Sequence, residues 1–256
     1  MAKMILSDYG FRSRQDDRYA GPSLADFETQ ERFFTAITES EKPKVYHLRK
    51  LREAIIAGHR HDDFTLKVYQ FSVYCCIVER EWPELTKSLG RIQEIVPKCS
   101  LLSIEMAELY LLFRICCLSS QKVLVADAQS ILTFLAGLEP KVEASQPIQS
   151  AKALLLAFNS LNYLFICKFY DECDMHRKIL MGCILPHFRT RIVQAFKKAY
   201  YTYPVAKLRD FLVLRLDNEW DSFVSDTQLV IRDDNVIFKV VKTRQASKAE
   251  SVKITM

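Results

Sequence analysis

The chain has 256 residues, of which 49% are hydrophobic and 11% aromatic, with only 6 glycines and 8 prolines. This composition excludes an intrinsically disordered chain and predicts a helix-rich folded protein, long enough for one large domain or two small ones. The formal net charge of +5 is mild, so the distribution of charge along the chain is more informative than its total.

The cysteines predict reduced thiols and not a disulfide framework. The first ten residues contain no apolar stretch long enough for a secretory signal, which favours a cytosolic or nuclear protein. No window approaches ~18 uninterrupted apolar residues, so we expect no membrane span. Adjacent cysteines on a helix point about 100° apart and do not easily close a disulfide, so we interpret the two adjacent pairs as core residues. The eight cysteines are Cys75, Cys76, Cys99, Cys116, Cys117, Cys167, Cys173 and Cys183.

Helical periodicity dominates the chain up to residue 202. Residues 1–25 are polar and predict a flexible arm. Segments of about 15 residues with apolar positions at helical spacing then alternate with short turns, as in antiparallel helical hairpins. Gly58 and Pro97 predict helix ends, while Asp62-Asp63 and Trp82-Pro83 predict helix starts. The predicted segments are one from about residue 26, then 43–58, 64–81, 82–97, 101–118, 122–138, 146–170, 172–181 and 185–201.

The last part of the chain has a different pattern. Two short amphipathic segments, 204–216 and 218–228, precede two alternating apolar runs, 229–232 and 236–241, joined by a turn at 233–235. Helix, helix and a two-stranded wing is the order of a winged-helix module. These patterns divide the chain into a flexible arm (1–25), a helical-repeat array (26–202), a winged helix (203–243) and a flexible tail (244–256).

Basic residues gather where the array meets the winged module. Between residues 189 and 215 Asp210 is the only acidic residue. These cations either form a solvated helix surface or bind phosphates or an acidic partner, and further cations of the wing suit a contact with a nucleic-acid backbone or groove. The candidate nucleic-acid-binding residues are Arg189, Arg191, Lys197, Lys198, Lys207, Arg209, Arg215, Arg232, Lys239 and Lys242.

Apolar and aromatic residues of the same region suggest a protein-binding surface. Three tyrosines precede the first helix of the winged module, where some are expected to be exposed and to stack on a partner, although packing in the core is the alternative. Apolar residues of the wing complete the set. The candidate partner-binding residues are Tyr200, Tyr201, Tyr203, Val230, Ile237 and Phe238.

Signals for catalysis and for metal binding are weak. The glycines are scattered singly, and neither a Gly-x-Ser-x-Gly nor a His-Glu-x-x-His pattern occurs. One Cys/His constellation matches no common zinc spacing. We therefore expect a protein that is not an enzyme and has neither cofactor nor metal. That constellation is Cys167, Cys173, His176, Cys183 and His187.

Several motifs together resemble the GANP/Sac-three family of PCI-domain proteins. The run Phe64-Thr-Leu-Lys-Val-Tyr69 and its continuation to Leu85 is similar to the family's signature helix pair, although Thr86-Lys87-Ser88 stands where the family has Asn-Gln-Cys. Residues 41–52 resemble its lead-in. Residues 151–170 resemble its Asn-Tyr helix, and 188–212 resemble the helix that leads into its winged module. The resemblance extends over residues 43–241.

The resemblance implies a mainly α fold. The expected architecture is an antiparallel, tetratricopeptide-like, right-handed solenoid that ends in a winged-helix subdomain with a small β-hairpin, the PCI domain. It further implies a nuclear, also cytoplasmic, scaffold that couples transcription to messenger-RNA processing and export. Implied partners are a second PCI-domain protein, a small acidic disordered subunit of the Sem/Dss type, and RNA or DNA, but no membrane. The alternative is a PCI subunit of the proteasome lid, the signalosome or a translation initiation factor, with a purely structural role.

Overall fold

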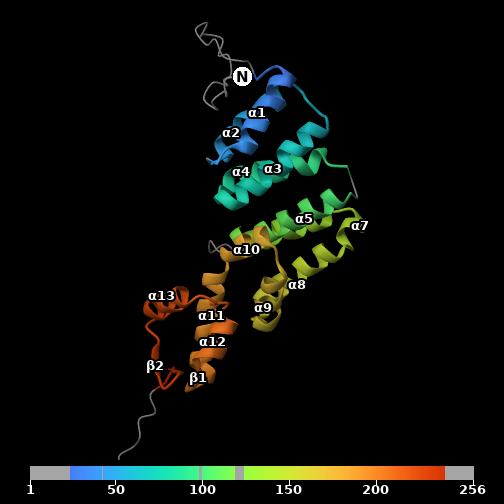
Figure 1. Cartoon of the computed structure of the whole chain (residues 1–256). Helices are drawn as coiled ribbons and strands as arrows, with labels where there is room; N and C mark the ends of the chain where they lie inside the picture. Colours follow the sequence, from blue (N-terminus) through green and yellow to red (C-terminus); the bar gives the residue numbers. More distant parts are fainter. Residues whose placement is uncertain (1–23, 42, 98–99, 119–123, 240–256) are drawn as a thin grey trace, which may run out of the picture. The chain divides into compact units, whose positions relative to one another are not determined.

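The computed structural model describes residues 24–41, 43–97, 100–118 and 124–239 (Figure 1). Within these ranges the protein is mainly helical, with thirteen α-helices, a π-helical segment and a three-stranded antiparallel sheet. The chain forms two compact units that divide between Pro186 and His187. The predicted tail (244–256) lies outside the described residues. Of the predicted arm only residues 24 and 25 are described, and Leu24 is fully buried.

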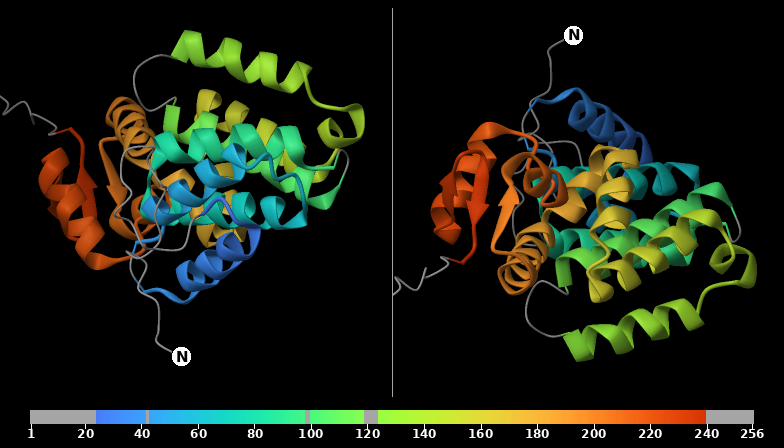
Figure 2. Two further views of the ribbon diagram at one scale, coloured as in Figure 1. Left: turned by 90° about the horizontal axis from the view of Figure 1, so that it is seen from above. Right: turned by 90° about the horizontal axis from the view of Figure 1, so that it is seen from below.

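The first unit consists of helices that pack mainly against their neighbours along the chain. Each of α1 to α4 packs on the next helix, and α8 packs on α5 and α9 (Figures 1 and 2). Helix α10 returns to contact α3, α5 and the π-helical segment η2. The bounds are α1 (Phe27–Glu39), α2 (Val45–Ala57), α3 (Asp63–Glu79), α4 (Trp82–Ile95), α5 (Leu101–Phe113), η2 (Arg114–Leu118), α6 (Leu124–Ala136), α7 (Pro140–Glu143), α8 (Gln146–Ser160), α9 (Tyr163–Glu172) and α10 (Met175–Gly182).

Capping residues define most of these helix ends, and the predicted ones are confirmed. Asp62 precedes α3 and accepts a hydrogen bond from the backbone N–H of Thr65 (3.0 Å), which satisfies an amide that the helix itself leaves unpaired. Gly58 caps the C-terminal end of α2, and Pro83 lies in the first turn of α4.

The single long helix predicted for residues 146–170 is wrong. Leu161 adopts the left-handed conformation (φ 56°) and ends α8, and the side chain of Asn162 then caps α9 by accepting a hydrogen bond from the N–H of Phe165 (3.2 Å). The apolar periodicity runs across the break, because apolar residues continue at helical spacing in both helices. A left-handed leucine carries no sequence signal, since glycine or asparagine usually takes this conformation.

A buried arginine joins three helices of the first unit. Arg52 of α2 is only 5% exposed, and its guanidinium donates hydrogen bonds to Ser72 of α3 and to Ser88 and Glu84 of α4. Ser72 and Ser88 are fully buried. A desolvated charge is tolerated only when it is paired and hydrogen-bonded, so this network fixes the positions of the three helices relative to one another.

A second arginine joins α10 to α5. Arg177 binds Glu108 through two hydrogen bonds, from Nε (3.0 Å) and Nη2 (2.5 Å), and also pairs with Asp174. Glu108 is 5% exposed, and its hydrogen bonds raise the pKa of Arg177 above the ordinary value. This two-point contact fixes α10 against a helix about 70 residues earlier in the chain.

The second unit combines three helices with the sheet. The strands lie in the order β1-β3-β2, with β3 in the centre, and both pairings are antiparallel. Asp233 and Asp234 form a two-residue turn between β2 and β3, and both have positive φ (47° and 56°), as a type I′ hairpin turn requires. The bounds are α11 (Leu185–Ala199), β1 (Thr202–Pro204), α12 (Val205–Phe211), α13 (Asp217–Thr227), β2 (Val230–Arg232) and β3 (Asn235–Ile237).

The predicted hairpin is present, but it is shorter than expected and is joined by a third strand. Asn235, which was assigned to the turn, pairs with Arg232 and belongs to β3. Strand β1 was not predicted, because a strand of three residues that ends in a proline is too short to show alternation. The unit also begins at His187, whereas the sequence placed α11 in the array and the boundary at 202/203.

We predict that Arg52→Ala destabilises the protein by about 3–5 kcal/mol, because Glu84 then keeps only its exposed partner Lys87, and the buried hydroxyls of Ser72 and Ser88 lose their charged donor. The measurement is urea unfolding of the full chain followed by circular dichroism. The matched control is Arg49→Ala, which removes an exposed pair with Glu53 on the same helix and should leave the unfolding midpoint unchanged. Equal effects of the two substitutions would contradict a special role of the buried network.

Candidate binding surface of the C-terminal unit

An aromatic cluster holds the second unit together. The ring of Phe196 in α11 is 6% exposed and lies 4.8 Å from that of Tyr203, 5.1 Å from Tyr200, 6.1 Å from Phe211 and 6.2 Å from Phe238 (centroid distances). The cluster thus connects α11, β1, α12 and the residue after β3. Tyr203 and Phe238, which were predicted to bind a partner, contribute to this packing and are half-buried.

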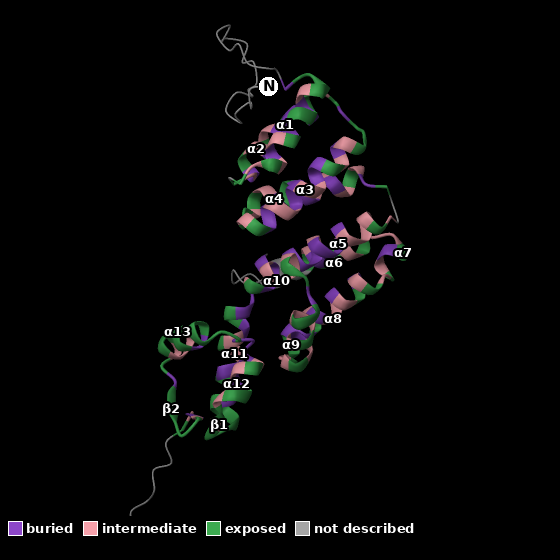
Figure 3. Ribbon diagram, in the orientation of Figure 1, coloured by how far each residue is buried: buried purple, intermediate pink, exposed green. Residues whose placement is uncertain are grey.

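The sheet exposes apolar side chains along β2. This strand pairs only with β3 among the described residues, and all three of its residues are exposed (Figure 3). Val230 is 49% exposed and pairs with Ile237, while Ile231 is 39% exposed and pairs with the buried Val236. We call Val230 and Ile231 the apolar edge. An edge strand with apolar side chains is a template for pairing with another chain.

Other exposed apolar residues belong to the same unit. Tyr201 (58%) and Tyr200 (44%) precede β1, and Leu216 (58%) precedes α13. Ile231 and Leu216 were absent from the predicted partner-binding set. All three residues of β2 are exposed, so Ile231 belongs to the exposed surface together with Val230.

Two of the predicted nucleic-acid-binding arginines make contacts within their own unit. Arg189 donates hydrogen bonds from Nε to the carbonyl oxygen of Leu212 (2.7 Å) and from Nη2 to that of Val213 (2.8 Å). Val213 has a positive φ of 54°, so the arginine satisfies carbonyls at a sharp reversal of the chain. Arg209 forms an ion pair with Asp217 (2.8 Å) and lies over the ring of Trp220 (5.8 Å).

Two more of these cations contact groups of their own unit. Arg215 forms an ion pair with Asp210 (3.3 Å), the one acidic residue of the basic stretch. Lys239 donates a hydrogen bond to the carbonyl oxygen of Lys198 (2.8 Å) and lies over the ring of Tyr201 (5.2 Å). This contact ties the end of the hairpin to the C-terminal end of α11, where positive charge is favourable.

The remaining candidates form a smaller basic set. Arg191 is half-buried, and Lys242 lies outside the described residues. Four exposed cations have no acidic partner within the described part of the chain, and we call them the exposed cations. Two of them end α11, one lies on α12 and one on β2. They are Lys197, Lys198, Lys207 and Arg232.

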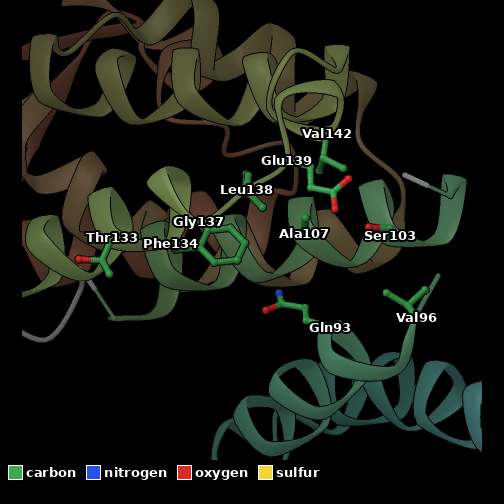
Figure 4. A pocket seen from close by; sticks show the side chains of 10 residues that line it. All are labelled: Gln93, Val96, Ser103, Ala107, Thr133, Phe134, Gly137, Leu138, Glu139 and Val142. Atoms are coloured by element: carbon green, nitrogen blue, oxygen red, sulfur yellow. The ribbon is translucent and has the colours of Figure 1, made fainter. Parts of the chain in front are cut away.

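The first unit contains a cavity of about 300 Å³ between the end of α4, α5, α6 and α7 (Figure 4). Its polar side chains are the amide of Gln93, the hydroxyls of Ser103 and Thr133, and the carboxylate of Glu139. Nε2 of Gln93 is buried without a hydrogen-bond partner. The described lining contains neither cysteine nor histidine, so it offers no activated thiol or imidazole base.

A second cavity of about 480 Å³ does contain both a cysteine and a histidine. Cys75, Tyr74 and His176 line it together with apolar side chains and with the charged side chains of Glu41, Lys44 and Glu79. Burial raises the pKa of the Cys75 thiol to about 12. Burial and a hydrogen bond to Glu105 raise the pKa of Tyr74 to about 12. Both groups are therefore neutral near pH 7, whereas a nucleophilic thiol needs a lowered pKa.

The Cys/His constellation, from which no metal site was predicted, is not gathered as a ligand set among the described residues. The ring of His176 packs on that of Tyr74 (centroids 4.7 Å apart), and Cys173 is buried. Among the described residues, no three histidine, cysteine or acidic side chains are grouped as metal ligands would be. His187 belongs to the second unit.

Comparison with known proteins adds no family. No model of a known protein family matches the chain, and no curated protein sequence matches it. None of the described helices is both long enough and apolar enough to span a bilayer.

We predict that Arg189→Ala destabilises the protein by about 1–3 kcal/mol, because it leaves two half-buried carbonyl groups without donors. Thermal unfolding of the full chain measures this. Lys197→Ala removes the same charge from the exposed side of the same helix and should change stability by less than about 0.5 kcal/mol. If Arg189→Ala were as stable as the wild type, the arginine would not support the end of α12.

Proposed function

We propose that the chain is a non-catalytic scaffold subunit of a nuclear complex that couples transcription to messenger-RNA processing and export. In this proposal α1 to α10 form a right-handed, tetratricopeptide-like solenoid, and α11 to β3 form a winged helix, as in the GANP/Sac-three family that the sequence resembles. The partners are a second PCI-domain protein, a small acidic disordered subunit of the Sem/Dss type, and nucleic acid. The location is the nucleus, and also the cytoplasm.

The apolar edge is the observation that carries the proposal. Strand β2 is paired on one side only, and it presents Val230 and Ile231 to solvent. In most proteins an edge strand of this kind carries charged side chains that prevent pairing, or is covered by another element. Pairing with a strand of another subunit would cover both side chains and satisfy the outward backbone groups.

The exposed cations support the nucleic-acid part of the proposal. Lys197, Lys198, Lys207 and Arg232 keep their charge available for phosphates, because no described acidic side chain neutralises them. Phosphate contacts of this kind give affinity without sequence preference. An acidic peptide would be attracted by the same charges.

The contacts of Arg189 and Arg209 favour a second candidate function, a purely structural one. Arg189 and Arg209 are engaged by backbone carbonyls and an aspartate, so the basic surface is smaller than the sequence indicates. A reduced basic surface beside an intact apolar edge fits a PCI subunit of the proteasome lid, the signalosome or an initiation factor. That role needs protein contacts and no nucleic acid.

The absence of catalysis is part of the proposal, and the two cavities support it. One has no thiol or imidazole in its described lining, and the other holds a thiol and a phenol whose raised pKa values keep them neutral. A thiol whose pKa is raised in this way is not an activated nucleophile.

The partner contact is tested with Val230→Asp. We expect the full chain to copurify with a second PCI-domain protein and the variant to lose it, since a carboxylate cannot be buried unpaired in a strand interface. The free chain should lose less than about 1 kcal/mol of stability, because Val230 is half exposed. Leu156→Asp, at an exposed leucine of α8, is the matched control and should retain the partner. Retention of the partner by both variants would exclude the apolar edge as its binding site.

Nucleic-acid binding is tested by titrating single-stranded RNA at several salt concentrations. We expect affinity to fall with a slope of roughly −0.7 per phosphate contact, and to be lost when the four exposed cations are replaced by glutamate. The control replaces Arg32, Arg49, Lys87 and Lys168, all more than half exposed in the first unit, and should keep binding. No binding by the wild type at ~50 mM salt, alone or with its partner, would favour the purely structural role.

A further inference from the structure

The cavity between the end of α4, α5, α6 and α7 has the form of a small binding site (Figure 4). Val96 and Val142 are buried in its wall, whereas Thr133 and Gly137 are exposed, so the cavity opens to solvent beside the C-terminal end of α6. Its volume of about 300 Å³ is that of about ten molecules of liquid water and lies at the lower end of the range for ligand pockets. This size suits a small molecule better than a segment of protein chain.

One buried polar group of the wall lacks a partner. The side chain of Gln93 extends from the end of α4 toward the other lining side chains (Figure 4), and its Nε2 is buried without a hydrogen-bond partner among the described residues. Such groups are rare in folded proteins, because a buried donor without an acceptor costs its full desolvation. The terminal torsion of a glutamine is soft, so the amide turns toward an acceptor in the cavity at little cost. The wall therefore offers a donor that the protein itself does not use.

The charge of the lining restricts which acceptor fits. Glu139 contributes the one carboxylate of the described lining, which contains no cation. A carboxylate or phosphate of a ligand would be repelled by it, even though either group accepts hydrogen bonds well. A neutral carbonyl oxygen accepts the bond from Gln93 without this repulsion. The lining also contains acceptors for an N–H group of the ligand, since the hydroxyl of Ser103 and the carboxylate of Glu139 both have lone pairs.

The rest of the lining suits an apolar body. Ala107 is buried, and Phe134 and Leu138 are half-buried at the cavity. The ring of Phe134 packs on that of Tyr110, with centroids 4.5 Å apart, which holds this part of the wall in place. A ligand with an apolar ring would extend this packing and cover the exposed part of Phe134.

We propose that this cavity binds a small neutral molecule that combines an apolar body with one carboxamide group. The carbonyl oxygen accepts a hydrogen bond from Nε2 of Gln93, and the apolar body packs on Phe134 and Leu138. The site is one for binding and not for catalysis. It lies wholly within the first unit, so the proposal is independent of the proposed scaffold function.

The test is a titration of the nitrogen-15-labelled full chain with benzamide, which carries one ring and one carboxamide, followed by NMR. We expect saturable binding that shifts the side-chain NH₂ signals of Gln93. We also expect nuclear Overhauser effects between the ring protons of benzamide and the methyl groups of Val96, Ala107 or Val142, a measurement that needs no variant. Benzoate, which has the same ring but a negative charge, should bind at least about tenfold more weakly.

Two glutamine variants separate a binding role from a packing role. Gln93→Leu removes the donor and nearly keeps the volume, so benzamide should bind roughly three- to tenfold more weakly. The Tm of this variant without ligand should equal or exceed that of the wild type, because an unpaired buried amide is removed. Gln146→Leu, at an exposed glutamine of α8, is the matched control and should leave the affinity for benzamide and the Tm nearly unchanged.

Several outcomes would overturn the proposal. They are the absence of saturable benzamide binding by the wild type, equal affinities for benzoate and benzamide, and equal affinities of Gln93→Leu and the wild type for benzamide. Overhauser effects only to residues outside the cavity would overturn it as well, and this outcome is measurable even if Gln93→Leu does not fold. None of these results bears on the apolar edge or on the exposed cations, so the scaffold function is tested separately.

Discussion

The desolvation of arginine is the constraint around which this protein is arranged. A guanidinium carries five donors and keeps its charge at any physiological pH, so burying it demands several acceptors at fixed positions. Arg52 finds them on two neighbouring helices, and Arg177 finds them on a helix distant in the sequence. Arg60 is 5% exposed between the rings of Phe27 and Phe64 and pairs with Glu31 and Asp62. Each arginine thereby specifies one arrangement of its neighbours.

The same use of arginine reshapes the candidate surface. Basic residues counted from the sequence suggest one broad positive stretch, but Arg189 and Arg209 serve the backbone and side chains of their own unit. A guanidinium group that is already hydrogen-bonded to carbonyl oxygens of its own unit attracts phosphates weakly. What remains is a smaller group of exposed cations and an apolar edge strand, the two features on which the proposed partner contacts rest.

The pKa values of the cysteine thiols depend on the surroundings of each residue. Cys75 is held neutral by burial, which raises its pKa to about 12. The pKa of Cys183 is lowered instead, because hydrogen bonding with the Cys117 thiol outweighs burial. Similar residues in one helical unit therefore have pKa values shifted in opposite directions, according to the groups that surround each of them.

Local signals in the sequence determined the helical content, most helix limits and the hairpin. Asp62, Gly58 and Pro83 act on the backbone within one turn of themselves, and Asp233-Asp234 sets its own turn, so no distant residue is needed to recognise them. Long-range packing decided the rest. Strand β1 exists because β3 pairs with it, and Leu161 is left-handed where α8 ends and the chain turns into α9, which packs on α8. The internal use of Arg189 likewise depends on carbonyl groups 23 and 24 positions away, and such separations leave no periodic trace in a single sequence.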